Sequence, residues 1–291
     1  MKISSIYKNK KRVFSLEVFP PKKNGSADSI YDTLAGLSGI KPDFISVTYG
    51  AGGNVADKTT AEIAGLIKKD YGTESMAHLT CVATGEDDAR QILRTFSEYG
   101  IENVLALRGD VSPERVPAGR FSHASDLAEY IRQNGDFDIG GACYPEVHTE
   151  AASAEEDIRN LKIKTEAGVT FLISQLFFDT PVFFAFLERA RAAGINVPVS
   201  AGIMPVLNAK QIERMVTLCG ASIPKELARM MSKYADEPDE LRARGIDYAV
   251  RQIRALAEGG VDGIHLYTMN KPDVANQIFA SVKDLFGSNG Q

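Results

Sequence analysis

Long apolar runs, closely spaced cysteines and an excess of positive charge are all absent from this sequence of 291 residues. No stretch approaches the ~18 consecutive apolar residues of a membrane-spanning helix, and the basic residues 1–12 lack the apolar core of a secretory signal. The three cysteines, Cys81, Cys143 and Cys219, form no CxxC or Cys/His spacing, which argues against a zinc site. A net charge of −5 argues against nucleic acid as the main partner. We therefore expect a cytoplasmic protein that binds neither membrane nor nucleic acid and acts on small molecules.

The signatures of three common enzyme classes are also missing. Residues 19–23 (Phe-Pro-Pro-Lys-Lys) follow the first expected strand and cannot form the GxGxxG turn of an open dinucleotide-binding sheet. Neither a Ser–His–Asp order nor a cysteine-nucleophile motif supports a hydrolase. No expected strand carries an interior lysine, which a Schiff-base lyase on a barrel would need.

Short apolar runs rich in β-branched and aromatic residues alternate with amphipathic stretches along the whole chain. The runs predict eight strands, at 13–19, 44–49, 77–82, 104–108, 139–144, 171–176, 197–203 and 263–268. The stretches between them predict helices at 26–37, 59–69, 87–99, 125–133, 155–167, 182–193 and 209–218, and a longer helical region at 224–257.

Continuous apolar strands that alternate with helices are typical of a parallel sheet covered by helices. Eight such units suit a closed barrel better than an open sheet of five or six strands. The sequence therefore predicts an α/β fold, a (β/α)8 TIM barrel with one or two extra helices before the last strand. Because no Pro/Gly/Ser linker or low-complexity run divides the chain, we expect residues 1–291 to form a single domain.

In a barrel of this kind, catalytic groups lie at the carboxyl ends of the strands. Glu17 is a carboxylate within the first apolar strand, where burial would favour its protonated form and suit it to acid catalysis; the alternative is a core glutamate paired with Lys or Arg. His78 lies in the third strand, and a single histidine there is more often a core residue than a functional one. A glycine-rich loop at 50–53 suits close approach of a ligand, although such loops also close ordinary turns.

Polar residues also end the fourth, fifth and sixth strands. Arg108 and Asp110 flank Gly109 and could offer donors and an acceptor to one planar heterocycle, the alternative being a local ion pair. Residues 143–148 combine polar and aromatic groups, and the amide of Gln175 matches the edge of a pterin or a flavin.

One face of the helix expected at 155–167 carries Asp157, Asn160 and Lys164, at spacings of three and four residues. Such a face is usually solvated, and the sharper interpretation is a site for the anionic part of a cofactor.

Taken together, motifs at the ends of the expected strands resemble those of the methylenetetrahydrofolate reductase family, in its short bacterial form. They are found, in order along the chain, at 16–21 (LEVFPP), 47–51 (VTYGA), 78–81 (HLTC), 106–110 (ALRGD), 144–148 (YPEVH), 175–179 (QLFFD), 202–205 (GIMP) and 265–270 (HLYTMN). Each motif alone is weak, but eight in register are a specific signal that spans nearly the whole chain.

The resemblance implies a flavoprotein oxidoreductase of one-carbon metabolism that supplies methyl groups for methionine biosynthesis. Electrons would pass from NADH or NADPH through N5 of bound FAD to 5,10-methylenetetrahydrofolate in ping-pong fashion, giving 5-methyltetrahydrofolate. By family analogy the chain would form a homo-oligomer. FAD contacts implied by the resemblance are Thr48, His78, Arg108, Gly109, Asp110, His123, Ala124, Tyr144, His148, Asp157, Asn160 and Lys164.

The resemblance further makes Glu17 the general acid that protonates N10 of the folate, with Asp110 as a second catalytic residue. Folate contacts would be Glu17, Asp110, Gln175, Gln211 and Lys271.

Four positions depart from the family pattern. His123 replaces a tyrosine beside the flavin, Ile163 replaces a basic residue, Met215 replaces an aromatic near the folate and nicotinamide, and Lys271 replaces an arginine at the glutamate tail of the folate. The last change turns a bidentate contact into a single-point one. These departures concern ligand affinity and do not touch Glu17 or Asp110.

Two other functions compete with the reductase. One is a flavin-free barrel lyase or aldolase acting on a phosphorylated substrate, which the lack of an interior lysine disfavours. The other is a flavin- or folate-binding subunit of an electron-transfer complex, which Glu17, Asp110 and Gln175 together disfavour.

Overall fold

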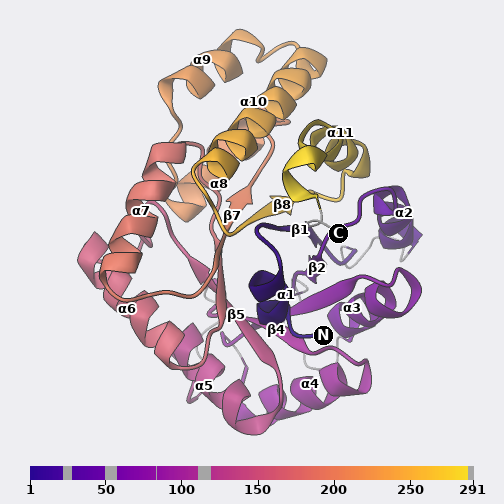
Figure 1. The fold of residues 1–291 in the computed structure, drawn as a ribbon, viewed down its shortest axis with the longest axis vertical. Coiled ribbons are helices and arrows are strands. Elements are labelled where there is room, and N and C mark those ends of the chain that lie inside the picture. The colour runs from indigo at the N-terminus through magenta and orange to yellow at the C-terminus, as the bar shows by residue number, and fades with distance from the viewer. Residues whose placement is uncertain (22–27, 50–57, 83, 111–118, 288–291) are drawn as a thin grey trace.

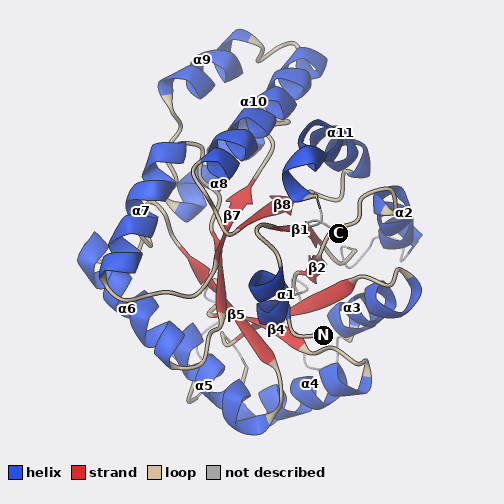
Figure 2. Cartoon of the chain, in the orientation of Figure 1, coloured by secondary structure: helices blue, strands red, loops and turns tan. Residues whose placement is uncertain are grey.

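Parallel strands close into a barrel in which each strand pairs with its neighbours in the sequence, and the last strand pairs with the first (Figures 1 and 2). This is a computed structural model that describes residues 1–21, 28–49, 58–82, 84–110 and 119–287. Within those residues the strands are β1 (Val13–Val18), β2 (Phe44–Val47), β3 (Glu74–Thr80), β4 (Asn103–Leu107), β5 (Asp138–Cys143), β6 (Phe171–Ser174), β7 (Val199–Ile203) and β8 (Gly263–Tyr267). The predicted (β/α)8 barrel is confirmed.

Helices surround the barrel, and α1 lies across one of its ends (Figure 1). Those that follow β1 to β7 are α2 (Asp28–Leu37), α3 (Thr59–Asp70), α4 (Glu86–Glu98), α5 (Ala124–Asn134), α6 (Ala154–Glu166), α7 (Thr180–Ala192) and α8 (Ala209–Cys219). The remaining helical elements are α1 (Ile3–Asn9), α9 (Lys225–Lys233), α10 (Pro238–Glu258), α11 (Pro272–Val282) and the 3-10 turn η1 (Lys283–Phe286). The extra helices expected before the last strand are therefore α9 and α10.

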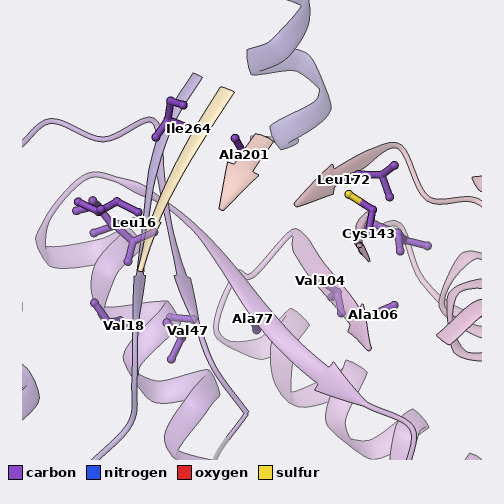
Figure 3. Close-up of a cluster of buried hydrophobic side chains, with 14 of the residues drawn as sticks. Leu16, Val18, Val47, Ala77, Val104, Ala106, Cys143, Leu172, Ala201 and Ile264 are labelled. Carbon is purple, nitrogen blue, oxygen red and sulfur yellow. The ribbon is translucent and has the colours of Figure 1, made fainter. Parts of the chain in front are cut away.

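The main hydrophobic core lies between the strands and the surrounding helices. Alternate residues of a strand point to opposite faces, and the outward set is apolar and buried, as Figure 3 shows for Leu16, Val47, Ala77 and Ile264. Because the inward set is covered as well, β1 is buried at every position, including its two polar residues, Ser15 and Glu17.

The amino-terminal end of the barrel is closed from below by α1. Ile3 and Ile6 pack there against inward-facing Phe44 and Phe171 in a separate apolar cluster. The amide of Ile3 donates to Oδ1 of Asn103 at 2.9 Å, and this bond satisfies one of the free N–H groups at the start of α1.

Helices α1 and α11 were not expected from the sequence, and several strand boundaries differ from those expected. The residues of α1 look like a polar terminal segment in the sequence, although Ile3 and Ile6 are buried. Strands β3, β4 and β5 begin earlier than expected, at Glu74, Asn103 and Asp138. These polar strand starts meet α1 or its neighbours, so tertiary contacts rather than strand propensity set the boundaries.

Among the described residues, no helix combines the length and the apolar character needed to cross a membrane.

Candidate active site

Polar side chains fill the barrel interior above the apolar floor. Ser15 and Glu17 are two positions apart on β1 and so face the same way, and the pairing of β1 with β8 places Ser15 opposite His265. Glu17 is 8 % exposed, His78 5 % and His265 0 %. This burial confirms that Glu17 lies within the barrel, at its carboxyl half.

Two histidines converge on the carboxyl group of Glu17. Its Oε2 lies 3.6 Å from Nε2 of His78 and 3.6 Å from Nε2 of His265, which is beyond hydrogen-bonding distance. Within the described part of the chain these histidines approach Glu17, and no Lys or Arg forms an ion pair with it. The core ion pair with Lys or Arg that the sequence left open is therefore not what the structure shows.

His78 is held in its neutral form by its surroundings. Burial lowers the pKa of His78 to about 4, only partly offset by the charge of Glu17. Its Nε2 is buried and has no hydrogen-bond partner in the described structure. Buried polar atoms are normally satisfied, so this atom marks a place where a ligand group is expected.

His265 is a site residue that sequence reasoning did not single out. Its Nδ1 lies 2.7 Å from Oγ of Ser15, and its Nε2 lies 3.4 Å from Oγ of Ser46. The ring also stacks on Phe44, with centroids 6.1 Å apart. In the sequence it stood out only as the first residue of the 265–270 motif, far along the chain from Glu17.

Tyr267 and Gly202 form the next layer toward the strand ends. The hydroxyl of Tyr267 donates to the carbonyl of Ser174 at 2.8 Å, and burial raises the pKa of Tyr267 well above its usual value. A Cβ at Gly202 would lie 2.3 Å from that same carbonyl and 2.7 Å from the Tyr267 hydroxyl, so only glycine fits here. Beside them, the side chain of Gln175 accepts a hydrogen bond from the amide of Leu176 at 2.8 Å.

A second polar group lies over the ends of β4 and β5. The guanidinium of Arg108 donates to both carboxylate oxygens of Glu150, which raises the pKa of Arg108 and lowers that of Glu150. The Glu150 amide donates to Nδ1 of His148 at 3.1 Å, and the His148 ring meets that of Tyr144 edge-on at 4.6 Å. The local ion pair that was the alternative for Arg108 does form, with Glu150 rather than Asp110.

Electrostatics tie Asp110 and α6 to this second group. Burial raises the pKa of Tyr144 to about 12, and the nearby charges of Asp110 and Asp157 add to that shift. Asp157 accepts from the amide of His148 at 3.2 Å, and burial raises the pKa of Asp157. Burial lowers the pKa of Lys164, whose Nζ donates to the Ala142 carbonyl at 2.7 Å. The face of α6 expected to carry Asp157 and Lys164 therefore turns toward the strand ends.

The other expected cofactor contacts lie at the edges of these groups. Gly109 has a φ of +83°, a conformation that favours glycine, directly before Asp110. Thr48 follows β2 and its carbonyl accepts from the Thr60 hydroxyl at 3.1 Å. His123 precedes α5 with its side chain 73 % exposed, and Ala124 is the buried first residue of that helix. Asn160 is exposed on α6.

The expected folate contacts outside the barrel interior lie farther apart. Gln211 is exposed in the first turn of α8, and Lys271 is exposed just before α11. Met215 is half-buried beside an apolar cluster that includes Leu176 and Met204. The glycine-rich loop at 50–53 lies outside the described residues.

A cavity of about 300 Å³ lies away from these groups, on the outside of the barrel between α2 and the start of β2. Its lining includes Leu34, Ile40 and Tyr71. Because it lies toward the amino-terminal ends of the strands, it is not where a barrel places its chemistry.

A family model described as "Methylenetetrahydrofolate reductase" matches residues 2–283. The chain belongs to the methylenetetrahydrofolate reductase family. It is 37 % identical over 264 residues to the 5,10-methylenetetrahydrofolate reductase of Escherichia coli, covering 91 % of this chain and 88 % of that protein. The Pectobacterium carotovorum protein of the same name is 36 % identical with the same coverage. These bacterial relatives confirm the resemblance to the short form of the family.

A plant relative is longer. Methylenetetrahydrofolate reductase (NADH) 1 of Arabidopsis thaliana is 36 % identical over 284 residues, which cover 92 % of this chain and 48 % of that protein. Among solved structures, an uncharacterized Clostridium thermocellum protein that binds two copies of 5-methyl-5,6,7,8-tetrahydrofolic acid matches with a TM-score of 0.70 and 17 % identity, over 97 % of this chain and 98 % of that one. At that identity the likeness supports the fold alone.

Proposed function

We propose that this protein is a flavin-dependent reductase that converts 5,10-methylenetetrahydrofolate to 5-methyltetrahydrofolate with electrons from NADH or NADPH. Residues 1–291 would act as a single catalytic domain with FAD as the cofactor. The observation that carries the proposal is the buried carboxyl of Glu17, 3.6 Å from two histidines at the active end of a barrel. It is the kind of group that proton donation to a folate nitrogen requires, in a chain whose relatives bear the name of that reaction.

The polar groups around the strand ends fit a flavin nucleotide. Arg108, which is paired with Glu150, and Lys164, whose amine donates to the Ala142 carbonyl, are the basic groups near the ends of β4 and β5 that we expect to meet a pyrophosphate. The unpaired Nε2 of His78 and the ring of Tyr144 supply a hydrogen-bonding atom and an aromatic surface. We expect Thr48, Gly109, Asp110, His123, Ala124, His148, Asp157 and Asn160 to complete this site.

When bound, the flavin supplies hydride acceptance and donation at N5. Glu17 donates its proton to N10 of the folate, which opens the bridging ring, and is left as a carboxylate. The apolar floor and the packed strands around Glu17 keep water away from the carboxyl group. Asp110, at the rim beside Tyr144, orients the folate and is the second residue on which we expect catalysis to depend.

The remaining folate contacts are proposed for Gln175, Gln211 and Lys271. The side-chain oxygen of Gln175 accepts a hydrogen bond from the amide of Leu176, and it must give up or share this bond to bind the pterin. Lys271 is exposed, as a residue that meets the charged glutamate tail would be. The departures from the family pattern at His123, Ile163, Met215 and Lys271 concern the affinity for flavin and folate and leave the proposed roles of Glu17 and Asp110 untouched.

Anaerobic stopped-flow absorbance of the purified protein tests the proposal. NADH is mixed first, NADPH replaces it in a parallel experiment, and methylenetetrahydrofolate is added second. We expect the flavin absorption band to bleach with the nicotinamide and to return with the folate, in two separable half-reactions. Independent half-reactions of this kind are the kinetic mark of a ping-pong scheme.

Other outcomes would favour the competing functions. A bound flavin that neither nicotinamide bleaches would favour a subunit of an electron-transfer complex. A colourless protein that takes up no FAD would contradict the reductase and leave a barrel lyase as the better hypothesis.

A further inference from the structure

The segment that follows β6 brings Gln175 to the carboxyl end of the barrel interior. Phe171 and Ile173 of β6 belong to the apolar cluster of the floor, and alternate residues of a strand face the same way, so Gln175 faces the interior too. Its amide donates to the carbonyl of Cys143 at 2.7 Å, which continues the pairing with β5 by one residue. Gln175 is therefore the last side chain that β6 directs into the barrel before the chain turns toward α7.

Directly after Gln175, the backbone receives two hydrogen bonds from α10. The hydroxyl of Tyr248 donates to the carbonyl of Phe178 at 2.7 Å, and Nε2 of Gln252 donates to the carbonyl of Phe177 at 2.9 Å. Tyr248 and Gln252 are four residues apart, so they lie one turn apart on the same face of the helix. One helix thus holds two consecutive carbonyls of the segment that leads away from the proposed folate contact.

The same face of α10 approaches the segment after β7 at backbone distance. A Cβ on Gly245 would lie 1.7 Å from the carbonyl oxygen of Val206, so no other residue fits here without moving the helix. Gly245, Tyr248 and Gln252 follow one another at intervals of three and four residues, which places them on one face. Helix α10 therefore packs directly on the two segments that lead away from β6 and β7.

The glutamine in this contact is a poor choice for stability alone. Gln252 is 5 % exposed, and its Oε1 has no hydrogen-bond partner within the described residues. A buried amide oxygen without a partner costs free energy that an apolar side chain of the same size would not. Nearby, Leu176, Phe178 and Leu241 belong to one apolar cluster, in which an apolar residue would pack well. What the amide adds is the position of the Phe177 carbonyl that its Nε2 binds.

We propose that Tyr248 and Gln252 are positioning residues, which hold the backbone after β6 so that Gln175 meets the pterin of the folate. The inference rests on the proposed function, in which Gln175 contacts the folate. When Gln175 gives up or shares its bond to the Leu176 amide, the backbone beyond Leu176 stays fixed by α10. Loss of either bond to α10 is therefore expected to weaken folate binding and to leave the step at Glu17 unchanged.

Titration calorimetry of the purified protein with 5-methyltetrahydrofolate measures this effect without turnover. Tyr248→Phe keeps the ring and removes the hydroxyl, and Gln252→Leu keeps a side chain of similar size and removes the donor. We expect each variant to raise the Kd by about fivefold, the usual contribution of one net hydrogen bond. In stopped flow the Kd for methylenetetrahydrofolate should rise in the same way, and the limiting rate of flavin reoxidation should stay near that of wild type.

A double-mutant cycle shows whether the effect passes through Gln175. Gln175→Ala should itself raise the Kd, and adding Tyr248→Phe should raise it no further, because the side chain that the backbone positions is gone. Tyr130→Phe is the matched control, since its hydroxyl donates to the carbonyl of Glu86 at 3.1 Å, at the start of α4. This variant loses the same kind of bond elsewhere and should leave the Kd unchanged.

An unchanged Kd in both Tyr248→Phe and Gln252→Leu would overturn the inference. It would also be overturned if the effect of Tyr248→Phe persisted in full beside Gln175→Ala, or if the limiting rate fell while the Kd stayed constant. A wild-type protein that binds no folate would contradict the proposed function, and the inference with it. Folate binding that is normal in every variant would contradict the inference alone, so the two failures are distinguishable.

Discussion

The floor and the upper interior of the barrel are filled in opposite ways. Around the floor, Phe44 and Phe171 meet Ile3 and Ile6 of α1 in an apolar cluster. Above it, the same strands place Glu17 among histidines and serines, including one imidazole nitrogen without a hydrogen-bond partner. Burying polar groups without complete hydrogen bonding costs free energy, and the apolar floor does not carry this cost. We infer that the floor stabilises the fold and that the upper interior is kept polar for chemistry.

The largest expected effect comes from removing the acid of the upper interior. Glu17→Gln should slow folate reduction by about 10²–10⁴-fold, the usual contribution of a general acid, and leave flavin reduction by NADH nearly unchanged. Stopped flow measures both half-reactions separately. Glu74→Gln, a buried carboxylate of the amino-terminal end bonded to Lys68 at 3.1 Å, is the matched control and should retain both rates. An equal loss of both half-reactions in Glu17→Gln would contradict the assigned role.

The second largest effect is expected from a substitution that creates a cavity in the apolar floor. Phe171 is fully buried against Phe44, with ring centroids 6.3 Å apart, so Phe171→Ala should lower the free energy of unfolding by about 3–5 kcal/mol. Urea denaturation measures this loss, and the rates of the folded fraction should change little. Tyr31→Ala, at a half-exposed position on α2, is the control and should lie within about 0.5 kcal/mol of wild type. A floor variant that lost activity but not stability would reverse the comparison.

Lowering the pH should reduce the stability of the folded protein through protonation of His78. Its pKa is about 4 in the folded protein against an ordinary 6.5, so the unfolded chain binds a proton more readily between those values. Stability is therefore full above pH 6.5 and declines by about 3 kcal/mol as the pH falls toward 4. Denaturation midpoints measured across this window in wild type and His78→Gln check the expectation. Parallel pH curves for the two proteins would show that another group is responsible.

The smallest effect is expected at the rim. Gly202→Ala would bring a methyl group to 2.3 Å from the Ser174 carbonyl, and relief of that contact should cost about 1–3 kcal/mol of stability. Because the same methyl approaches the Tyr267 hydroxyl, near-ultraviolet circular dichroism should also change. At Gly39 the nearest atom to an added Cβ is 3.5 Å away, so Gly39→Ala is the matched control and should be close to neutral.

The barrel could be predicted from the sequence because its signal is local. Most strands are short and largely apolar runs, as in β1, where every position is buried, and most are followed by an amphipathic stretch. By contrast, α1 was missed because a helix with only Ile3 and Ile6 buried has too weak a pattern to stand out in a polar segment. The early start of β4 depends on the bond between Asn103 and α1, and that of β3 on the bond between Glu74 and Asn103; the sequence reveals neither contact.

The site was predicted in part. Glu17 stood out as a carboxylate in an apolar strand, and the structure adds the partners that chain distance concealed, above all His265. The pairing of β1 with β8 is what brings them together, and it exists only once the barrel has closed. Likewise Glu150, which engages Arg108, lies in a loop with no motif to mark it.

The plug formed by α1 closes the amino-terminal end of the described part of the barrel. Ile3, Ile6 and the floor residues place an apolar barrier between bulk water at that end and the carboxyl group of Glu17. In the proposed reaction the folate occupies the opening at the carboxyl ends of the strands, so we expect the proton that Glu17 donates to be taken up before the folate binds. In deuterated solvent, the isotope on the donated proton would then record the medium before folate binding, not the medium present while the ring opens.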